Sequence, residues 1–115
     1  MQLFGIPNCN TVKKARDWLD SHQIAYAFHD FKKNGVSYDL LENWLTQRPW
    51  EKLVNRAGMT WRNLSDAEKA AVTGAPSAIL LMLAKPSVIK RPVLVKDGTI
   101  ISLGFDEATY KELFK

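Results

Sequence analysis

The chain has 115 residues, of which 46% are hydrophobic and 24% charged, so we expect residues 1–115 to form a single globular domain. One cysteine and two histidines exclude an internal disulfide and a structural zinc site with four Cys and His ligands. We therefore expect no metal. The net charge of +4 is mild and spread along the chain, which suits anionic substrates but is not a nucleic-acid signature. We also expect no membrane span, because the longest apolar run covers only residues 78–84. With no secretory signal pattern either, a protein of the reducing cytoplasm is expected.

The first thirty residues predict a strand, a helix and a second strand. Residues 2–6 form a short apolar run, and residues 25–31 alternate in the manner of a strand. Between them lies a helix that Asn10 or Thr11 is expected to cap. Two strands joined by a crossover helix predict a parallel pair. The apolar face of this helix consists of Val12, Ala15, Trp18 and Leu19.

A helical insertion is predicted over about residues 37–85. Ser37 is expected to cap its first helix, and Ser65 begins a capping box before a short later helix. Residues 59–64 lack a helical pattern and are expected to be irregular. Residues 77–85 predict a helix that is apolar nearly all round and therefore buried.

The end of the chain predicts a β-hairpin and a final helix. Residues 93–96 and 99–103 are the strands, because Asp97 and Gly98 form a strong two-residue turn signal between them. Asp106 is expected to cap the helix that follows. The whole order is therefore β-α-β, a helical insertion, then β-β-α, which predicts an α/β fold with a four-stranded mixed sheet.

Cys9 is the candidate nucleophile, since it follows the first predicted strand and precedes the first predicted helix. Unpaired N–H groups at a helix start carry partial positive charge, and they lower the pKa of a cysteine placed there. Lys13 adds positive charge in the first turn, although it also suits a solvated helix face. Asn8, Asn10 and Thr11 either donate to a substrate or only shape the turn and cap. The alternative for Cys9 is an ordinary buried cysteine.

Three separated motifs resemble the arsenate reductase (ArsC) and Spx family, and most closely its small YffB-type members. They are Gly-Ile-Pro-Asn-Cys-Asn-Thr-Val-Lys-Lys-Ala at 5–15, Asn-Arg-Ala-Gly-Met-Thr-Trp-Arg at 55–62, and Pro-Ser-Val-Ile-Lys-Arg-Pro-Val-Leu at 86–94. The resemblance covers essentially the whole chain and implies a thioredoxin-like fold.

The resemblance also implies roles for individual residues. Cys9 matches the reactive, redox-active cysteine of the family, and Arg91 matches an arginine that binds the oxyanion or steadies the thiolate. Pro92 matches the cis-proline that lies against the cysteine, and Arg56 lies within about one residue of a second anion-binding arginine. Contacts to glutathione or another substrate are expected from Asn8, Asn10, Thr11, Lys13, Arg56, Arg91 and Pro92.

The sequence also departs from the family pattern. The third arginine of the reductases has no counterpart in residues 103–106, which counts against arsenate as the substrate. Val12 stands where Spx-like members have a second cysteine, so the resolving thiol has to come from outside. We therefore expect a glutathione-dependent thiol oxidoreductase that uses Cys9 and Arg91, with glutathione as co-substrate and no bound cofactor. The alternative is a non-enzymatic regulator that binds RNA polymerase, as Spx-like members do.

Overall fold

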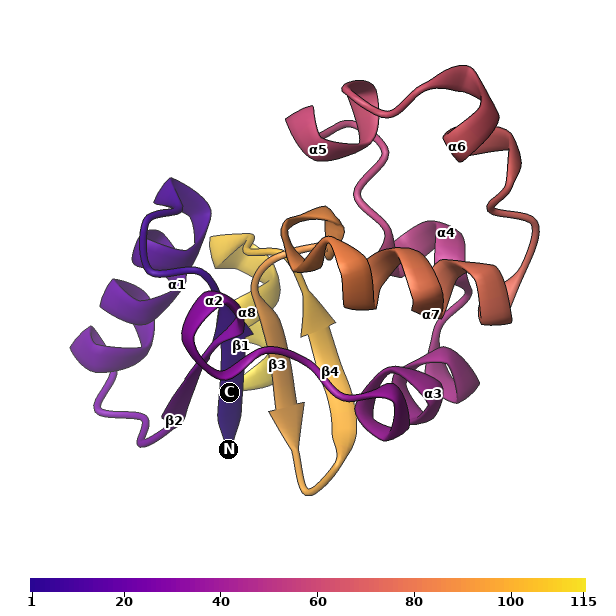
Figure 1. Ribbon diagram of the computed structural model, residues 1–115. Helices are drawn as coiled ribbons and strands as arrows, with labels where there is room; N and C mark the ends of the chain where they lie inside the picture. Colours follow the sequence, from indigo (N-terminus) through magenta and orange to yellow (C-terminus); the bar gives the residue numbers. More distant parts are fainter. The chain divides into compact units, whose positions relative to one another are not determined.

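The computed structural model describes residues 1–115, and its contacts divide the chain into two compact units (Figure 1). The first unit consists of Met1–Lys33 and Arg91–Lys115, and the second consists of Asn34–Lys90. The second unit extends the predicted insertion by a few residues at each end. The expectation of a single domain stays a prediction.

The first unit contains a four-stranded mixed sheet, as predicted. Its strands are β1 (Gln2–Gly5), β2 (Ala27–Asp30), β3 (Val93–Lys96) and β4 (Thr99–Leu103). They lie in the order β2-β1-β3-β4, so β2 and β4 form the two edges. The β1–β2 pair is parallel, and the other two pairs are antiparallel. The predicted crossover and hairpin are therefore both confirmed.

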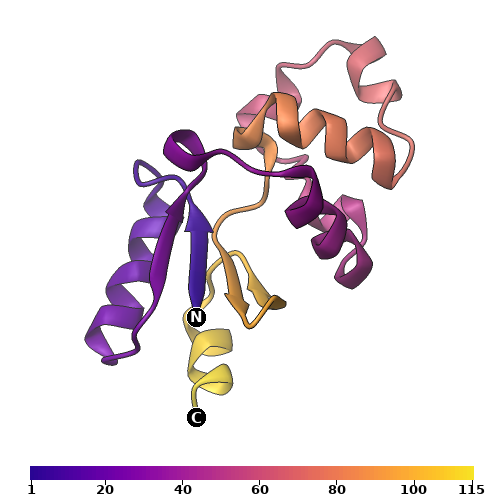
Figure 2. The ribbon, with the colours of Figure 1, turned by 60° about the horizontal axis from the view of Figure 1, so that its bottom comes forward.

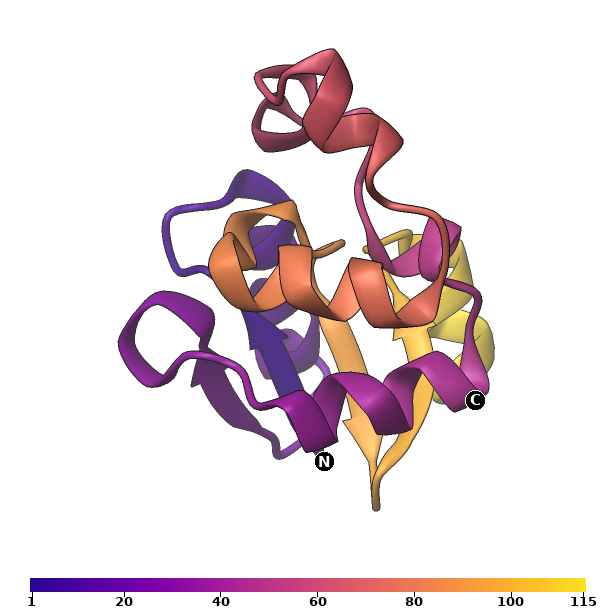
Figure 3. The same ribbon diagram turned by 45° about the vertical axis from the view of Figure 1, so that its right-hand side comes forward.

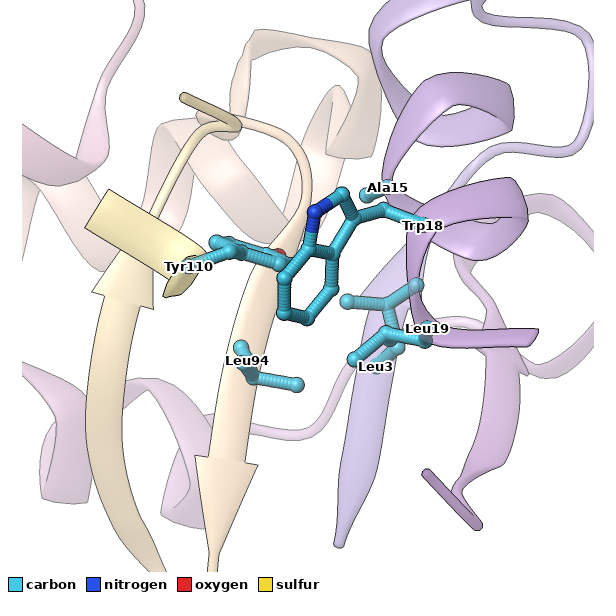
Figure 4. Packing of buried hydrophobic residues seen from close by; sticks show 6 residues of the cluster. All are labelled: Leu3, Ala15, Trp18, Leu19, Leu94 and Tyr110. Atoms are coloured by element: carbon cyan, nitrogen blue, oxygen red, sulfur yellow. The ribbon is translucent and has the colours of Figure 1, made fainter. Parts of the chain in front are cut away.

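Two helices, α1 (Asn10–Ser21) and α8 (Glu107–Leu113), share a core with one face of this sheet. Figure 4 shows the indole of Trp18 between side chains of the sheet and the ring of Tyr110. The Trp18 and Tyr110 rings meet edge to face, with centroids 5.4 Å apart, a favourable aromatic geometry. The buried members of this cluster are Leu3, Ala15, Trp18, Leu19, Leu94 and Tyr110.

The second strand is shorter than the predicted range of 25–31. It ends at Asp30, and Phe31 begins a single helical turn, α2 (Phe31–Asn34). The cause is the Asp30 carboxylate, which accepts the backbone N–H groups of Lys32 at 2.9 Å and Lys33 at 3.3 Å. A carboxylate at this position caps a turn and so competes with continued strand pairing.

The second unit is built from short helices. Figure 3 shows α3 and α7 side by side in this unit. Two predicted caps are present: the Ser37 hydroxyl accepts the Leu40 N–H at 3.1 Å, and Ser65 forms its capping box with Glu68. The elements are α3 (Tyr38–Gln47), α4 (Trp50–Leu53), α5 (Met59–Arg62), α6 (Asp66–Ala70), α7 (Ala75–Ala84) and the 3-10 turn η1 (Pro86–Val88).

One prediction for this unit is wrong, because residues 59–64 are not irregular. Met59 to Arg62 form α5, which starts at the N-cap Gly58 and ends at Asn63. A four-residue helix has too few positions for an apolar period to appear in the sequence. The unit is closed by a bridge between Val54 and Ile89.

The shared core predicts a clear contrast between two leucines of the first unit. Leu94 is fully buried in the cluster, whereas Leu113 at the end of α8 is 42% exposed. Leu94→Ala is expected to lower the free energy of unfolding by about 2–5 kcal/mol, since it removes buried contacts and leaves a cavity. Leu113→Ala is the matched control, with an expected change within about 0.5 kcal/mol. Urea unfolding measures both, and equal effects would contradict the core described here.

Candidate active site

Cys9 is the N-cap residue of α1. Its backbone is extended (φ −125°, ψ 125°), and its carbonyl accepts the Lys13 N–H at 2.9 Å as the first bond of the helix. The sequence prediction of Asn10 or Thr11 as the cap is therefore wrong. The prediction that Cys9 lies between strand and helix is confirmed, and its side chain is partly buried.

The surroundings of the thiol lower its pKa. Burial alone raises the pKa of Cys9, because it penalises the charged form. The backbone N–H groups of Val12 and Thr11 lower the pKa, and so do a hydrogen bond from the Arg91 side chain and its positive charge; together these contributions outweigh the effect of burial. The net effect is a pKa below that of an ordinary cysteine, which favours the nucleophilic thiolate.

Val12 is the contributor that the sequence interpretation missed. It is a fully buried valine, and nothing in its side chain indicates a role in chemistry. The signal is positional, because an N-cap side chain accepts from the second and third residues of its helix. With Cys9 as the N-cap, those residues are Thr11 and Val12.

Close packing holds the end of β1 against the start of α1. A Cβ atom added to Gly5 would lie 2.8 Å from Cγ2 of Val12, which is closer than Cβ atoms in proteins come to a non-bonded carbon. Gly5 therefore lets the strand and the first turn of the helix meet with no intervening side chain. The residue that packs here, Val12, is also the one whose backbone N–H lowers the pKa of Cys9.

Arg91 and Pro92, which immediately precede β3, form the other side of the site. The Arg91–Pro92 peptide bond is cis, as the resemblance implied. The carbonyl of the buried Pro92 accepts the Gly104 N–H at 2.8 Å, which ties this segment to the residue after β4. Gly104 has a φ of +77°, a conformation that glycine adopts readily.

The remaining predicted residues of the first unit lie on both sides of Cys9 in the chain. Asn8 belongs to the turn before Cys9 and is exposed. Asn10, Thr11 and Lys13 lie in the first turn of α1, where the side chains of Asn10 and Lys13 are exposed and Thr11 is partly buried. The structure thus groups four predicted binding residues along the loop and helix start that carry the thiol.

Arg56 belongs to the second unit, and its guanidinium lies over the ring of Trp50. The distance from its Cζ atom to the ring centroid is 5.4 Å, within the range of a cation–π contact. The Trp50 ring in turn lies 6.5 Å from that of Trp61. Stacking on an aromatic ring leaves the edge of a guanidinium open to an anion.

The two histidines have other contacts. Nδ1 of His22 lies 2.8 Å from the Trp18 carbonyl, and its ring stacks on the Trp18 indole at 3.8 Å. The ring of His29 lies 4.7 Å from that of Phe4. Neither histidine is among the groups that shift the pKa of Cys9.

No three His, Cys, Asp or Glu side chains gather in a way that suits a metal ion. The helices are also all too short or too polar to cross a bilayer.

Comparison with known proteins places the chain in a family. The model of the ArsC family matches residues 4–113, which is nearly the whole sequence. The chain belongs to the ArsC family. Its four-stranded sheet and helices are those of the thioredoxin-like fold found in solved ArsC-family structures.

Solved structures and a curated relative support the same assignment of this ArsC-family protein. A YffB protein is 46% identical, with a TM-score of 0.89 and coverage of 96% of both chains. An arsenate reductase (ArsC) related protein from Brucella melitensis is 49% identical, with a TM-score of 0.80 and coverage of 99% of this chain and 93% of that one. The global transcriptional regulator Spx of Streptococcus pyogenes serotype M6 is 29% identical, over 91% of this chain and 78% of its own.

The Gly5 contact leads to a test of how the ArsC-family site is built. Gly5→Ala pushes Val12 away from β1, so we expect unfolding to become easier by about 1–3 kcal/mol, as overpacking typically costs. The pKa of Cys9 is expected to rise, because the Val12 N–H moves with its residue. Urea unfolding and the pH dependence of alkylation measure the two effects.

Gly74→Ala is the control for this substitution. The nearest atom to a Cβ added at Gly74 is Cδ of Pro76, at 4.0 Å, so the added methyl group fits. A pKa of Cys9 that stays unchanged in Gly5→Ala, despite lost stability, would contradict the role assigned to the Val12 N–H.

Substitution of Arg91 is expected to change the pKa of Cys9 as well. Arg91→Met removes a hydrogen bond and a positive charge that favour the thiolate, so the pKa is expected to rise. Arg91→Lys keeps the charge and should raise it less. Since Cys9 is the only cysteine, the rate of alkylation by iodoacetamide as a function of pH reports this one thiol.

Lys96→Met provides the comparison, because it removes an exposed positive charge at the end of β3 that does not act on the sulfur. Wild type and Lys96→Met are expected to share one midpoint of alkylation, below that of free cysteine. Identical midpoints in wild type and Arg91→Met would show that Arg91 does not act on the thiolate.

Proposed function

We propose that this ArsC-family protein is a glutathione-dependent thiol oxidoreductase in which Cys9 is the only protein nucleophile. The observation that carries the proposal is the lowered pKa of Cys9 at the start of α1. Only the thiolate attacks disulfide sulfur, so a lowered pKa raises the reactive fraction at neutral pH. A dependence on reduced glutathione fits a reducing compartment such as the cytoplasm.

The proposed cycle has two thiol–disulfide exchange steps. In the first, the Cys9 thiolate attacks the glutathione sulfur of a mixed disulfide; a Cys9–glutathione bond forms, the old disulfide bond breaks, and the released substrate thiolate takes up a proton. In the second, the thiolate of another glutathione attacks the same sulfur. Oxidised glutathione leaves, and the Cys9 thiolate is restored. The sum is one mixed disulfide and one glutathione converted to a free thiol and oxidised glutathione.

Resolution by an external thiol follows from the absence of a second cysteine. The position after one helical turn is Val12, which contributes only its backbone to the site. A protein with one cysteine cannot form an internal disulfide, so its adduct persists until another thiol attacks it. Glutathione is the co-substrate that we propose for this step.

The carboxylates of glutathione need positive partners, and the chain offers several. Arg91 is proposed to contact the adduct, because it already lies at the sulfur. Lys13 is exposed one turn into α1, and Arg56 is proposed as a further carboxylate partner. Asn8, Asn10, Thr11 and Pro92 are proposed to line the remaining contacts.

Mass spectrometry tests the proposal directly. We expect oxidised glutathione to add about 305 Da to the wild type, which is one glutathionyl group on the only cysteine. Reduced glutathione is expected to remove the group and return the original mass. Cys9→Ser should gain no mass, and its fold is checked by circular dichroism.

Turnover supplies the second half of this test. A glutathionylated peptide should release its thiol in the presence of glutathione and wild-type protein, and this rate should fall to the uncatalysed level in Cys9→Ser. An adduct that forms but is not removed by glutathione would contradict the proposed resolving step. Arsenate reduction coupled to glutathione is the related activity to assay, although no arginine follows β4.

A second candidate function is a non-enzymatic regulator that binds RNA polymerase. It is favoured by the similarity to a protein named global transcriptional regulator Spx. Purified RNA polymerase and the protein, mixed at micromolar concentration and separated by size, distinguish the two candidates. A stoichiometric complex that also forms with Cys9→Ser, together with no glutathione turnover, would favour the regulator.

A further inference from the structure

The outer edge of β2 has main-chain groups that the sheet does not use. β2 is an edge strand paired only with β1, with Gln2 opposite Ala27 and Leu3 opposite Phe28. The Ala27 N–H donates to the Met1 carbonyl at 2.9 Å, so Ala27 directs its main chain toward β1. Because successive residues of a strand direct these groups to opposite sides, the N–H and carbonyl of Phe28 point outward.

A groove runs beside this edge, between α1 and β2. Figure 2 shows β2 as the outermost strand of its sheet with α1 next to it. The groove has a volume of about 370 Å³, within the usual range for binding clefts. It is lined by Arg16, Asp20, Ile24, Ala25, Tyr26 and Phe28.

Arg16 is held in place within this groove. Its Nε donates to the Tyr26 hydroxyl at 3.2 Å, and its Cζ atom lies 4.2 Å from the centroid of the Phe28 ring. Arg16 nevertheless forms no ion pair, since both ion pairs of the protein lie in α8 and the residues that follow it. A fixed guanidinium with no carboxylate partner has open N–H donors for a carboxylate of another molecule.

Asp20 gives the groove a second charge at a defined spacing. It lies four residues after Arg16 on α1, which corresponds to a rise of about 6 Å along the helix. Side chains two residues apart on a strand lie about 6.6 Å from each other on one face. A strand beside β2 with an acidic residue and a basic residue two positions apart therefore matches both charges.

We propose that the open edge of β2 binds an extended segment of a partner protein as a fifth strand, with an acidic side chain of that segment paired to Arg16. A basic side chain two positions further along pairs with Asp20. The main-chain bonds to Phe28 supply affinity, and the groove selects the side chains. This surface is separate from the Cys9 chemistry, so the proposal stands or falls independently of the proposed function.

A second copy of this chain fits the edge less well than a different protein does. The carboxylate of β2 itself is that of Asp30, and it already accepts the N–H groups of Lys32 and Lys33. The β2 strand of a second copy therefore brings no free carboxylate to Arg16. The charges of the groove favour a segment of another sequence.

The probe for this edge is the peptide acetyl-Thr-Val-Glu-Val-Lys-Val-Thr-amide. With ¹⁵N-labelled wild-type protein, we expect shifts confined to the amides of β2, Arg16 and Asp20, with a dissociation constant of about 1 mM. Replacing the peptide's Glu by Gln should weaken binding about fivefold, as for one exposed ion pair. N-methylation of the peptide at Glu and at both Val residues that flank it should abolish binding, because it removes the main-chain donors for either strand direction while keeping the charges.

Protein variants separate the charge from the fold. Arg16→Gln should weaken binding of the Glu peptide about fivefold and leave the weaker binding of the Gln peptide unchanged. Tyr26→Phe keeps the charge of Arg16 but removes the hydroxyl that holds it, and should cause a smaller loss. Lys96→Gln, an exposed cation after the last buried residue of β3, is the matched control with no expected effect.

Three results would overturn the proposal. One is the absence of any shift in β2 with peptide at several times the expected dissociation constant. Another is binding that the N-methylated peptide retains, since it would then not depend on strand pairing. The third is a concentration-dependent dimer in analytical ultracentrifugation that protects the Phe28 amide from exchange, because a second copy would then occupy the edge.

Discussion

The site depends on the close contact between the end of the first strand and the first turn of the first helix. Gly5 has no side chain, so Val12 packs directly against the strand, and the connecting loop places Cys9 at the N-cap position. In this position the backbone N–H groups of Val12 and Thr11, which have no partner within the helix, lower the pKa of the sulfur. A packing contact in the core thus contributes to the lowered pKa of a partly buried thiol.

The large features of the fold could be predicted from the sequence because they rest on periodicity and turn chemistry. Alternation and helical spacing predicted the strands and long helices, and Asp97–Gly98 predicted the hairpin that is present. The errors in predicting where α1 begins and where β2 ends arose because more than one residue or interaction could define each boundary. The preference of asparagine and threonine for N-caps pointed past Cys9 to the wrong residue, and the capping carboxylate of Asp30 ended β2 early.

The candidate site was predicted only as far as side-chain chemistry allowed. Cys9 and Arg91 were identified from residue type and family motif, and the structure places the Arg91 side chain at the Cys9 thiol. Val12 escaped notice because its contribution is a backbone N–H, which every non-proline residue has. The stacking of Arg56 on Trp50 likewise depends on tertiary contacts that no local pattern encodes.

The position of Cys9 as an N-cap has a consequence for the lifetime of anything attached to it. In thiol exchange, a thiol of lower pKa departs faster when its own disulfide is attacked. The amides that prepare the sulfur for attack therefore also make it a good leaving group once a covalent adduct has formed. An adduct on Cys9 also loses the negative charge that the helix start stabilises, so the α1 dipole favours the free thiolate over the modified form. In the proposed exchange with an external thiol, the start of α1 therefore stabilises Cys9 as the leaving thiolate.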